Sequence, residues 1–296
     1  MNGRNDRWTD RAAAAAFAVV LGVSAMWGQH DGAVRDNRGA AAMEDAREED
    51  ALSALTAQTL ESAETESGEE SGEPKAPALD ESQKAVLTEI MEDMKAGDLK
   101  SAASRINDNG EMLQGLFYEV MEGERYLYDG QGLKTSIEGE GMVFTMPGTV
   151  YYGTFKDGRP EGSCMALQAV ELDAPRYDYS QGLWKNGMME GEGHIGYCYY
   201  EGSPEGEAQD VCKTGTFTRD LMDGEVTYST MNGENETSVW KFEVEMGILR
   251  LDDRWNYGKE REEYQLMSED DDSHAYIIGG EMAGQAVWKN LLVWEE

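Results

Sequence analysis

The chain is poor in the residues that build disulfide frameworks, metal centres and basic surfaces. Its 296 residues include three cysteines, three histidines and six prolines, and 25 Lys and Arg stand against 59 Asp and Glu. Three cysteines exclude a disulfide-dense scaffold, and three histidines argue against a His-rich metal site. The net charge of −34 excludes nucleic-acid binding through a basic face, because neutralising phosphates requires clustered Lys and Arg. Binding to anionic lipid is disfavoured for the same reason.

Motifs of catalytic and ligand-binding sites are also lacking. His30, His194 and His274 are scattered along the sequence, with no nucleophile placed beside them. The acidic run at 268–273 lacks the alternating ligands of a calcium loop, and no Gly-x-Gly-x-x-Gly opens a helix. We therefore expect no enzyme, no catalytic residue, no cofactor and no bound metal.

Residues 1–30 predict a segment that enters a membrane. Three arginines precede an uncharged run from Ala12 to Gly28, which would be about 26 Å long as a helix. That length is short for a bilayer core of about 30 Å, and a short apolar run after basic residues also describes a cleavable signal peptide. Trp27 favours an uncleaved anchor, because aromatic residues concentrate at membrane interfaces. Either alternative exports the rest of the chain: a single-pass membrane protein with the remainder outside the cytoplasm, or a secreted one.

Residues 31–79 read as a disordered acidic linker. The segment 31–80 contains no Phe, Trp or Tyr, and carries 14 acidic and 4 basic side chains. Such a chain cannot bury enough apolar surface to offset its conformational entropy, and its repelling charges keep it extended.

Residues 80–125 predict a short helical region. Asp80 and Gln83 have the spacing of a capping box, Gly97 can end a first helix, and Asp98 can cap a second. Apolar residues recur at helical spacing through all three predicted helices. These apolar faces must pack on something, and we expect the following β region to be their partner.

The composition shifts beyond residue 126, where 22 of the 27 aromatic residues lie. Three segments, 151–162, 180–191 and 213–224, align without gaps. Each has a Gly at position 3, an aromatic residue at position 5 and a second Gly at position 12, counted from the first residue of the segment. Looser copies are predicted around Tyr128 and Trp240, and a weaker one around Ala275. The expected repeat glycines are Gly130, Gly139, Gly153, Gly158, Gly162, Gly182, Gly187, Gly191, Gly215, Gly224 and Gly247.

The spacing within each copy predicts a β-hairpin. Asp157-Gly158 and Asn186-Gly187 are strong type I′ turn sequences at positions 7 and 8. A two-residue turn there pairs position 5 with 10 and position 3 with 12, so Gly153 should face Gly162. Aromatic and glycine positions would then share one face, and the opposite face would be solvated.

These segments resemble MORN repeats (membrane occupation and recognition nexus), whose pattern is Tyr-x-Gly-x-Trp-x-x-Gly-x-x-x-Gly-x-Gly. The resemblance covers about residues 126–290 and is closest in the units that begin at Tyr151 and Ser180. Departures include Lys213 in the Tyr position, Asp220 in the turn Gly position, and Cys164 in the last Gly position. The resemblance implies a mainly β fold, an elongated antiparallel meander of stacked hairpins over 126–296. It also implies a scaffold or binding role, with membranes, self-association or partner docking as uses within the family.

The aromatic residues of the copies form a candidate binding face. Two alternatives remain open: the rings are the core of the stacked hairpins, or they form a groove that stacks on wall polysaccharide. The candidate residues are Tyr128, Tyr151, Phe155, Trp184, Phe217 and Trp240.

The cysteines offer one candidate disulfide. Cys198 and Cys212 are equally distant from residue 205, so strands that pair about that centre would bring the thiols together in an exported protein. Cys164 is expected to be a buried free thiol.

The sequence therefore predicts a non-catalytic, exported scaffold or protein-interaction module, tethered to the membrane through its N-terminal helix only. Its partner is an unknown protein or a second copy, and a carbohydrate-binding module of the cell wall is the alternative.

Overall fold

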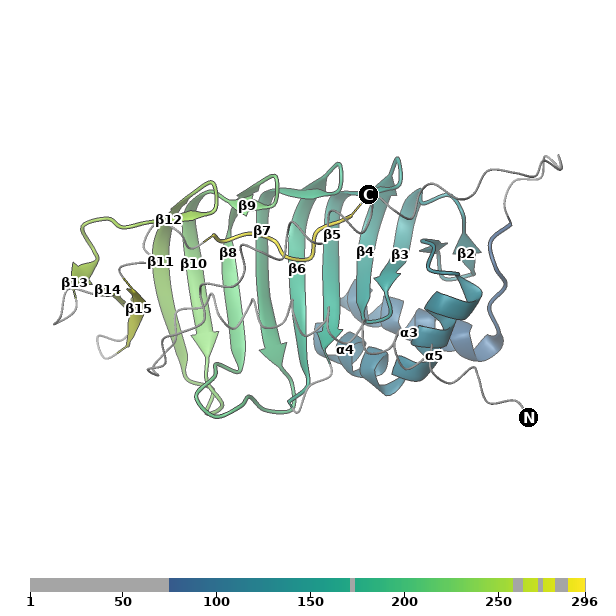
Figure 1. The fold of residues 1–296 in the computed structure, drawn as a ribbon, viewed down its shortest axis with the longest axis horizontal. Helices are drawn as coiled ribbons and strands as arrows, with labels where there is room; N and C mark the ends of the chain where they lie inside the picture. Colours follow the sequence, from purple (N-terminus) through teal and green to yellow (C-terminus); the bar gives the residue numbers. More distant parts are fainter. Residues whose placement is uncertain (1–74, 171–173, 258–262, 271–273, 280–286, 296) are drawn as a thin grey trace, which may run out of the picture. The chain divides into compact units, whose positions relative to one another are not determined.

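A computed structural model describes residues 75–170, 174–257, 263–270, 274–279 and 287–295. This part is mainly β: a 12-stranded antiparallel sheet, a small three-stranded sheet and three short α-helices (Figure 1). The expected anchor at 1–30 and residues 31–74 of the expected linker lie outside the described residues. No helix within the described ranges is both long and apolar enough to cross a bilayer.

The helices begin and end where the capping residues predicted. Asp80 and Gln83 form the capping box of α3 (Glu81–Ala96), and Gly97 ends it with φ 75°. Asp98 caps α4 (Leu99–Asp108) by accepting from the Ser101 amide. The chain continues through α5 (Gly110–Gly115) and a π-helical turn, η2 (Leu116–Val120). The expected helical region is confirmed.

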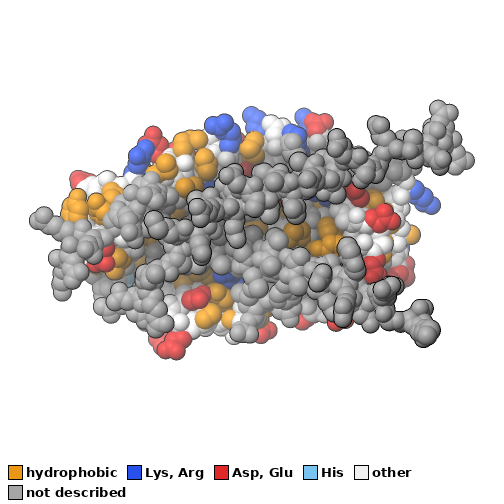
Figure 2. Space-filling view, in the orientation of Figure 1, with side chains coloured by type: hydrophobic (Ala, Val, Ile, Leu, Met, Phe, Trp, Pro, Cys, Tyr) orange, Lys and Arg blue, Asp and Glu red, His pale blue; other side chains and the backbone are white. Residues whose placement is uncertain are grey.

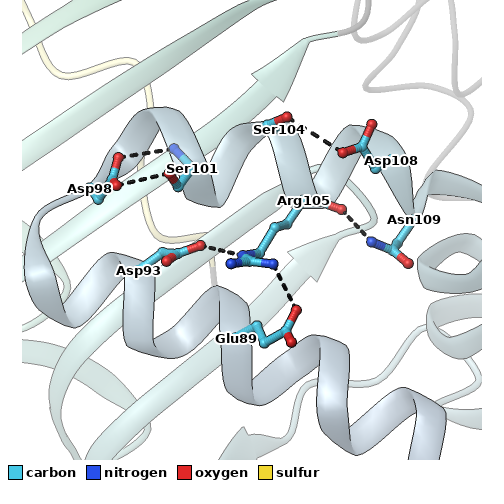
Figure 3. A network of polar contacts seen from close by, with 8 residues as sticks. All are labelled: Glu89, Asp93, Asp98, Ser101, Ser104, Arg105, Asp108 and Asn109. Carbon is cyan, nitrogen blue, oxygen red and sulfur yellow. Dashed lines mark hydrogen bonds and ion pairs between the residues drawn. The ribbon is translucent and has the colours of Figure 1, made fainter.

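One arginine joins the first two helices. Arg105 on α4 donates to Asp93 (2.5 Å) and Glu89 (2.7 Å), both on α3 (Figure 3). The side chains of Arg105 and Glu89 are 41% and 53% exposed and that of Asp93 is 19% exposed, so solvent screens this network and it contributes little to stability. Burial of the apolar helix faces does most of the stabilising.

The large sheet is an antiparallel meander in which sequence neighbours pair from β3 to β8 and from β10 to β12. Its strand order is β12-β11-β10-β8-β7-β6-β5-β4-β3-β1-β2, with β9 paired to β8 (Figure 1). The strands are β1 (Leu127–Tyr128), β2 (Leu133–Lys134), β3 (Gly139–Met146), β4 (Thr149–Lys156), β5 (Arg159–Val170), β6 (Arg176–Lys185), β7 (Met188–Tyr199), β8 (Asp210–Thr218), β9 (Leu221–Met222), β10 (Gly224–Met231), β11 (Thr237–Glu245) and β12 (Ile248–Arg250). The small sheet consists of β13 (Asn256–Tyr257), β14 (Glu263–Met267) and β15 (Ala275–Gly279).

Four hairpins turn with both central residues at positive φ, as type I′ turns require. Two are the turns expected at Asp157-Gly158 and Asn186-Gly187. The third, Arg219-Asp220, adopts the same conformation without a glycine. The fourth is Met246-Gly247, which joins β11 to β12. The turn prediction is confirmed, and the Gly position proves dispensable in one copy.

The expected register inside the hairpins is wrong beyond the first pair. Phe155 pairs with Pro160 as predicted, but Gly153 then faces Cys164 instead of Gly162. The return strand holds two extra residues opposite the outgoing one, which is a β-bulge. Gly162 lies in that bulge with φ 79°, a conformation that favours glycine.

The same displacement recurs in the second hairpin. Trp184 pairs with Met189, and Gly182 faces Gly193 where Gly191 was expected. Position 12 is therefore a bulge position in these copies. A Cβ at Gly182 would lie 2.6 Å from the Glu192 carbonyl oxygen, so position 3 needs glycine for close approach of the strands.

Two of the looser copies are out of register with the expectation. Gly247 occupies the turn at position 8, which places Trp240 at position 1 and not at position 5. In the first copy, Leu127 pairs with Val143 and so takes the inner place expected of Tyr128. Ala275 of the weak sixth copy begins β15 of the small sheet, and Gly280 and Gly284 lie outside the described residues.

Neighbouring hairpins are joined by a repeated carboxylate contact. The acidic residue at position 11 accepts a hydrogen bond from the first turn amide of the next hairpin. Glu138 accepts from Asp157 N (2.6 Å), Glu161 from Asn186 N (2.9 Å), Glu190 from Arg219 N (2.9 Å) and Asp223 from Met246 N (3.0 Å). We call these four residues the turn-capping carboxylates. Some of the acidic side chains of this chain therefore have a structural role.

The two faces of the large sheet carry different cores. Helical residues such as Leu87 and Ile90 pack with Phe144, Val150 and Leu167 of the strands in one apolar cluster. This confirms that the helices pack on the β region (Figure 1). The opposite face carries the aromatic residues of the hairpins. The face expected to be solvated is therefore exposed near the turns, as at Lys156 and Ser163, but covered by α3 and α4 over β4, β5 and β6.

β12 pairs with only the last residues of β11, and the segment after β14 forms hydrogen bonds with an earlier part of the same edge. Glu269 N donates to the carbonyl oxygen of Val239 (2.7 Å), and Val239 N donates to Ser268 Oγ (3.1 Å). An unpaired strand edge invites pairing with another chain. The segment after β14 removes part of that opportunity.

Candidate binding face and its C-terminal cover

Five of the six candidate aromatic residues gather on one face of the sheet. Tyr151 and Phe155 come from β4, Trp184 from β6, Phe217 from β8 and Trp240 from β11. Each side chain is at most 2% exposed, and all five belong to one core cluster. The rings are buried, so the candidate face is covered in this structure.

Tyr128 does not belong to that face. It pairs with Met142, and its ring lies in the core beneath the helices. Its hydroxyl is 2.7 Å from Thr88 Oγ1 and donates to the Lys84 carbonyl oxygen on α3. Its grouping with the other five rings is wrong, because the first copy is displaced by one residue and one residue reverses the face.

Residues 287–295, which we call the C-terminal strap, cover part of the aromatic face. In Figure 1 this yellow segment crosses the strands near their hairpin turns. Its side chains alternate: Trp288, Asn290 and Leu292 are at most 4% exposed, whereas Val287 and Val293 are 41% and 42% exposed. The strap therefore lies extended, with every second residue facing the sheet.

The end of the strap packs on the first hairpin. The Trp294 ring meets the Tyr151 ring edge-on at 5.0 Å and the Phe155 ring at 5.6 Å. Tyr151 donates its hydroxyl hydrogen to the Val293 carbonyl oxygen at 2.8 Å. Edge-to-face rings add stabilisation beyond their buried area, so this contact is specific as well as apolar.

The start of the strap packs between the third and fourth hairpins. Trp288 N donates to the Gly247 carbonyl oxygen (2.6 Å), and Met222 N donates to the Trp288 carbonyl oxygen (3.1 Å). The Trp288 ring stands edge-on to Phe242 at 4.8 Å. Tyr276 of the small sheet meets the same Phe242 ring at 4.9 Å. The small sheet is thus a second cover for this face.

Asn290 is the polar anchor in the middle of the strap. It is fully buried, and its Nδ2 donates to Asp220 Oδ1 at 2.9 Å while its backbone N donates to the Asp220 carbonyl oxygen at 2.7 Å. Ser180 Oγ donates to Asn290 Oδ1. Burial raises the pKa of Asp220, and the hydrogen bonds from Asn290 and Met189 N oppose that rise. Asn290 therefore binds the strap to the turn of the third hairpin and to β6 of the second hairpin.

A buried ion pair lies on the same face, away from the turns. Arg176 and Asp178 on β6 are 3% and 0% exposed, with Nε 2.9 Å from Oδ1 and Nη2 donating to Oδ2 at 3.2 Å. The guanidinium lies over the rings of Tyr197 and Tyr199, 4.8 and 5.4 Å from their centroids. Burial raises the pKa of Asp178 to about 6, against the lowering effect of Arg176.

Lys213 is the second buried cation of this face. It is 6% exposed and its Nζ lies 4.9 Å from the Trp288 ring centroid and 5.5 Å from that of Tyr228. Ammonium groups over aromatic faces are attracted by the ring quadrupole. Lys213 stands at the Tyr position of its repeat, so this departure from the MORN pattern places a charge against the strap.

The candidate disulfide is not formed. Cys198 faces Asp210, and Cys212 faces Gly196, so the two cysteines are not opposite each other, and both are free thiols. The strands pair about residue 204 instead of 205, which displaces the cross-strand partner by two residues. Burial raises the pKa of Cys198 to about 11, which disfavours its reactive thiolate. Cys164 is a buried free thiol, as expected.

His194 lies on the opposite face of β7. Its Nε2 is 3.1 Å from Gln181 Oε1, its ring meets Tyr179, and burial lowers its pKa. Across the described ranges, no group of three or more His, Cys, Asp or Glu side chains is placed to hold a metal ion. These contacts give His194 a packing role in the sheet.

The hairpin-turn edge carries both signs of charge. Figure 2 shows Lys and Arg side chains along the upper edge of the view, where the turns of Figure 1 lie. Lys156, Lys185 and Arg219 are exposed there, beside the turn-capping carboxylates. Local charges at this edge therefore offset one another despite the net charge of the chain.

The strap and the buried ion pair were absent from the sequence-based expectations. Alternation over residues 288–294 could have revealed an extended segment with one buried side, because Trp, Asn, Leu and Trp fall on alternate residues. Arg176 and Asp178 are likewise two residues apart in a strand, which places them on one face. Nothing local indicates that either set would be covered.

Comparisons with known proteins provide no relative for this chain. No protein-family model matches it, and the curated proteins compared with it contain no match.

Proposed function

We propose that this chain is a non-catalytic scaffold or protein-interaction module built from MORN-like repeats. In this proposal it is exported, tethered to the membrane by residues 1–30, and held away from the bilayer by the acidic spacer 31–79. The observation that carries the proposal is the regular geometry of the four hairpins, in which a carboxylate of the preceding unit caps each turn. Stacked identical units present long surfaces, which repeat proteins use for binding.

The buried polar groups support a structural role for the aromatic face. Arg176 pairs with Asp178, and Asn290 is held by Asp220 and Ser180. The first pair lies within the sheet and the second set holds the strap, and neither contains a nucleophile beside a base. The assignment as a non-enzyme rests on this use of the polar residues.

Protein interaction is favoured over carbohydrate binding. Sugar-binding rings must be accessible for stacking, whereas Tyr151, Phe155 and Trp184 are at most 2% exposed. A polysaccharide would first have to remove Trp294 from the first hairpin. A chain segment with alternating apolar residues already occupies that surface, so a polypeptide is the better-matched ligand class.

Crosslinking in intact cells tests the proposal. The full chain is expressed in a bacterial host, crosslinked with a membrane-impermeant reagent and analysed by mass spectrometry. We expect the chain in the membrane fraction and intermolecular crosslinks from residues 126–296 to a recurrent protein or to a second copy. Crosslinks confined to single chains, or a chain accessible only after lysis, would contradict the proposal.

A further inference from the structure

The strap is held to the sheet by contacts that a separate peptide could also make. It joins no continuous ladder: its backbone bridges are isolated, Leu221 with Lys289 and Ile248 with Val287. The remaining contacts are made by side chains and by turn backbone atoms. A segment attached in this way can leave without breaking the pairing of the large sheet.

The dimensions of the strap match the spacing of the hairpins. An extended chain rises about 3.4 Å per residue, so the six steps from Trp288 to Trp294 cover about 20 Å. Each hairpin adds two strands about 4.8 Å apart, so about 20 Å is the width of two hairpins. Trp288 accordingly lies at Gly247 and Met222, and Trp294 lies at Phe155 and Tyr151.

The surface beneath the strap, formed around Tyr151, Asp220 and Phe242, contacts each inward strap residue through a different chemistry. Two apolar places take Trp288 and Trp294, and the polar place between them offers the Asp220 carboxylate and carbonyl and the Ser180 hydroxyl. An asparagine side chain satisfies both a donor and an acceptor there, while an apolar residue would leave Asp220 Oδ1 without its donor from the strap. Leu292 fills the space between Asn290 and Trp294.

We propose that the surface beneath the strap is an exchangeable peptide site for an extended Trp-x-Asn-x-Leu-x-Trp segment, and that its occupant in trans is the C-terminal strap of a second copy. The inference rests on the proposed function, because it names the partner of the interaction module. Exchange between two copies keeps every strap contact, so it costs only the entropy of association. In a single copy the covalent link gives the strap a high effective concentration, which keeps the site closed at low protein concentration.

A peptide titration tests the site itself. A fluorescein-labelled peptide of residues 287–295 is titrated with the full chain, and fluorescence anisotropy reports binding. Asn290→Ala in the chain weakens the binding of the chain's own strap, which then competes less with the added peptide. This chain should therefore bind the peptide at least about tenfold more tightly than the unaltered chain. Lys289→Ala, at an exposed outward residue, is the matched control and should behave like the unaltered chain. The same peptide with Asn290→Ala should bind about tenfold more weakly.

Absence of peptide binding to a folded Asn290→Ala chain, or equal binding of both peptides, would overturn the site. Far-ultraviolet circular dichroism establishes folding. Should Asn290→Ala prevent folding, Trp294→Ala at the end of the strap takes its place, with Val293→Ala as its outward control.

Capture between two differently tagged full chains tests the occupant. After mixing, capture through one tag should retain the other chain increasingly with concentration, for the unaltered and Lys289→Ala proteins. Asn290→Ala in both chains, or excess unlabelled peptide, should abolish that capture. Capture that survives both treatments, or no capture of the unaltered chain at any concentration, would overturn the second copy as occupant. Either result leaves the proposed function standing, because that function is tested separately by the crosslinks and the accessibility of the chain in intact cells.

Discussion

The two faces of the large sheet are covered by different means. One face is covered over β4, β5 and β6 by α3 and α4, and the cluster there includes aliphatic residues such as Leu87, Ile90 and Leu167. The other lies beneath the C-terminal strap and the small sheet, and mixes aromatic rings with the buried Arg176–Asp178 pair and Asn290. The helical cover is local in sequence to the strands it protects, whereas the strap returns from the far end of the chain.

This difference suggests different roles for the two faces: the helical face contributes stability, and the strap face contributes specificity for the segment that covers it. Aliphatic packing is roughly proportional to buried area and tolerates exchange of similar side chains. Buried polar groups are stable only with their own partners in place, so they select one arrangement of the cover. We therefore expect the helical face to fix the fold and the strap face to choose which segment lies on it.

Removing the largest side chain of the strap should have the largest effect on the strap face. Trp288→Ala deletes a ring that is 2% exposed and packed on Phe242, and should lower the free energy of unfolding by about 4 kcal/mol. Urea denaturation measures this change. Val287→Ala, at the adjacent outward residue, should lower the free energy of unfolding far less. Equal losses of stability in the two variants would show that the inward side chains do not hold the strap on the sheet.

The buried ion pair should make the strap face sensitive to pH. Arg176→Met leaves the Asp178 carboxylate buried without its cation, at a cost of about 3 kcal/mol at pH 7. The pKa of Asp178 in the folded protein, about 6, is already above its ordinary value, so burial disfavours the charged form. Without Arg176 the pKa should rise further, because Arg176 lowers it in the native protein.

The loss caused by Arg176→Met should therefore be greatest at pH 7 and shrink as the pH falls towards 4, where Asp178 is protonated in the folded state. Denaturation of both proteins across this range provides the test. A loss that is constant with pH would mean that Asp178 is not charged in the native protein.

A turn-capping carboxylate should contribute less to the free energy of unfolding than Trp288 or the Arg176–Asp178 pair does. Glu161→Ala removes the acceptor for the Asn186 amide and should cost about 1 kcal/mol. Ser163→Ala, on an exposed neighbour in the same strand, is the control. Comparable unfolding curves for the two variants would deny the carboxylate a role in joining hairpins.

The network of Arg105, Glu89 and Asp93 on the helices should contribute least to the stability of the protein. Arg105→Ala breaks its contacts to Glu89 and Asp93, yet Arg105 and Glu89 are 41% and 53% exposed and only Asp93, at 19%, is more covered. We expect a small fall in melting temperature that disappears at high salt, because salt screens exposed charges. A large fall that persists in high salt would show that the helical cover also depends on polar contacts.

Local features of the fold were predictable from the sequence, because neighbouring residues determine them. The Asp80 capping box and the Asn186-Gly187 turn each depend on a few consecutive residues. The bulge at Gly162 was not predictable from an ideal hairpin, since uninterrupted pairing was assumed after a two-residue turn. The Cys198–Cys212 pairing failed for a related reason: it assumed a centre of pairing that differs by one residue from the real one.

The candidate site was predictable in its residues but not in its accessibility. Tyr151, Phe155, Trp184, Phe217 and Trp240 do share a face. What covers them depends on contacts between residues more than a hundred positions apart, such as Tyr151 with Val293. A repeat pattern describes relations between neighbouring hairpins and contains no information about a segment outside the repeats.

The turn-capping carboxylates link each described hairpin to the one that follows it. A unit that ends with an acidic residue at position 11 prepares the first amide of its successor, so tandem duplication of such a unit needs no new contact. Position 11 of the fourth hairpin is Arg250, which pairs with Glu245 within its own hairpin. A guanidinium has no acceptor to offer a following turn. Among the described hairpins, the fourth therefore lacks the carboxylate that each preceding unit offers to its successor.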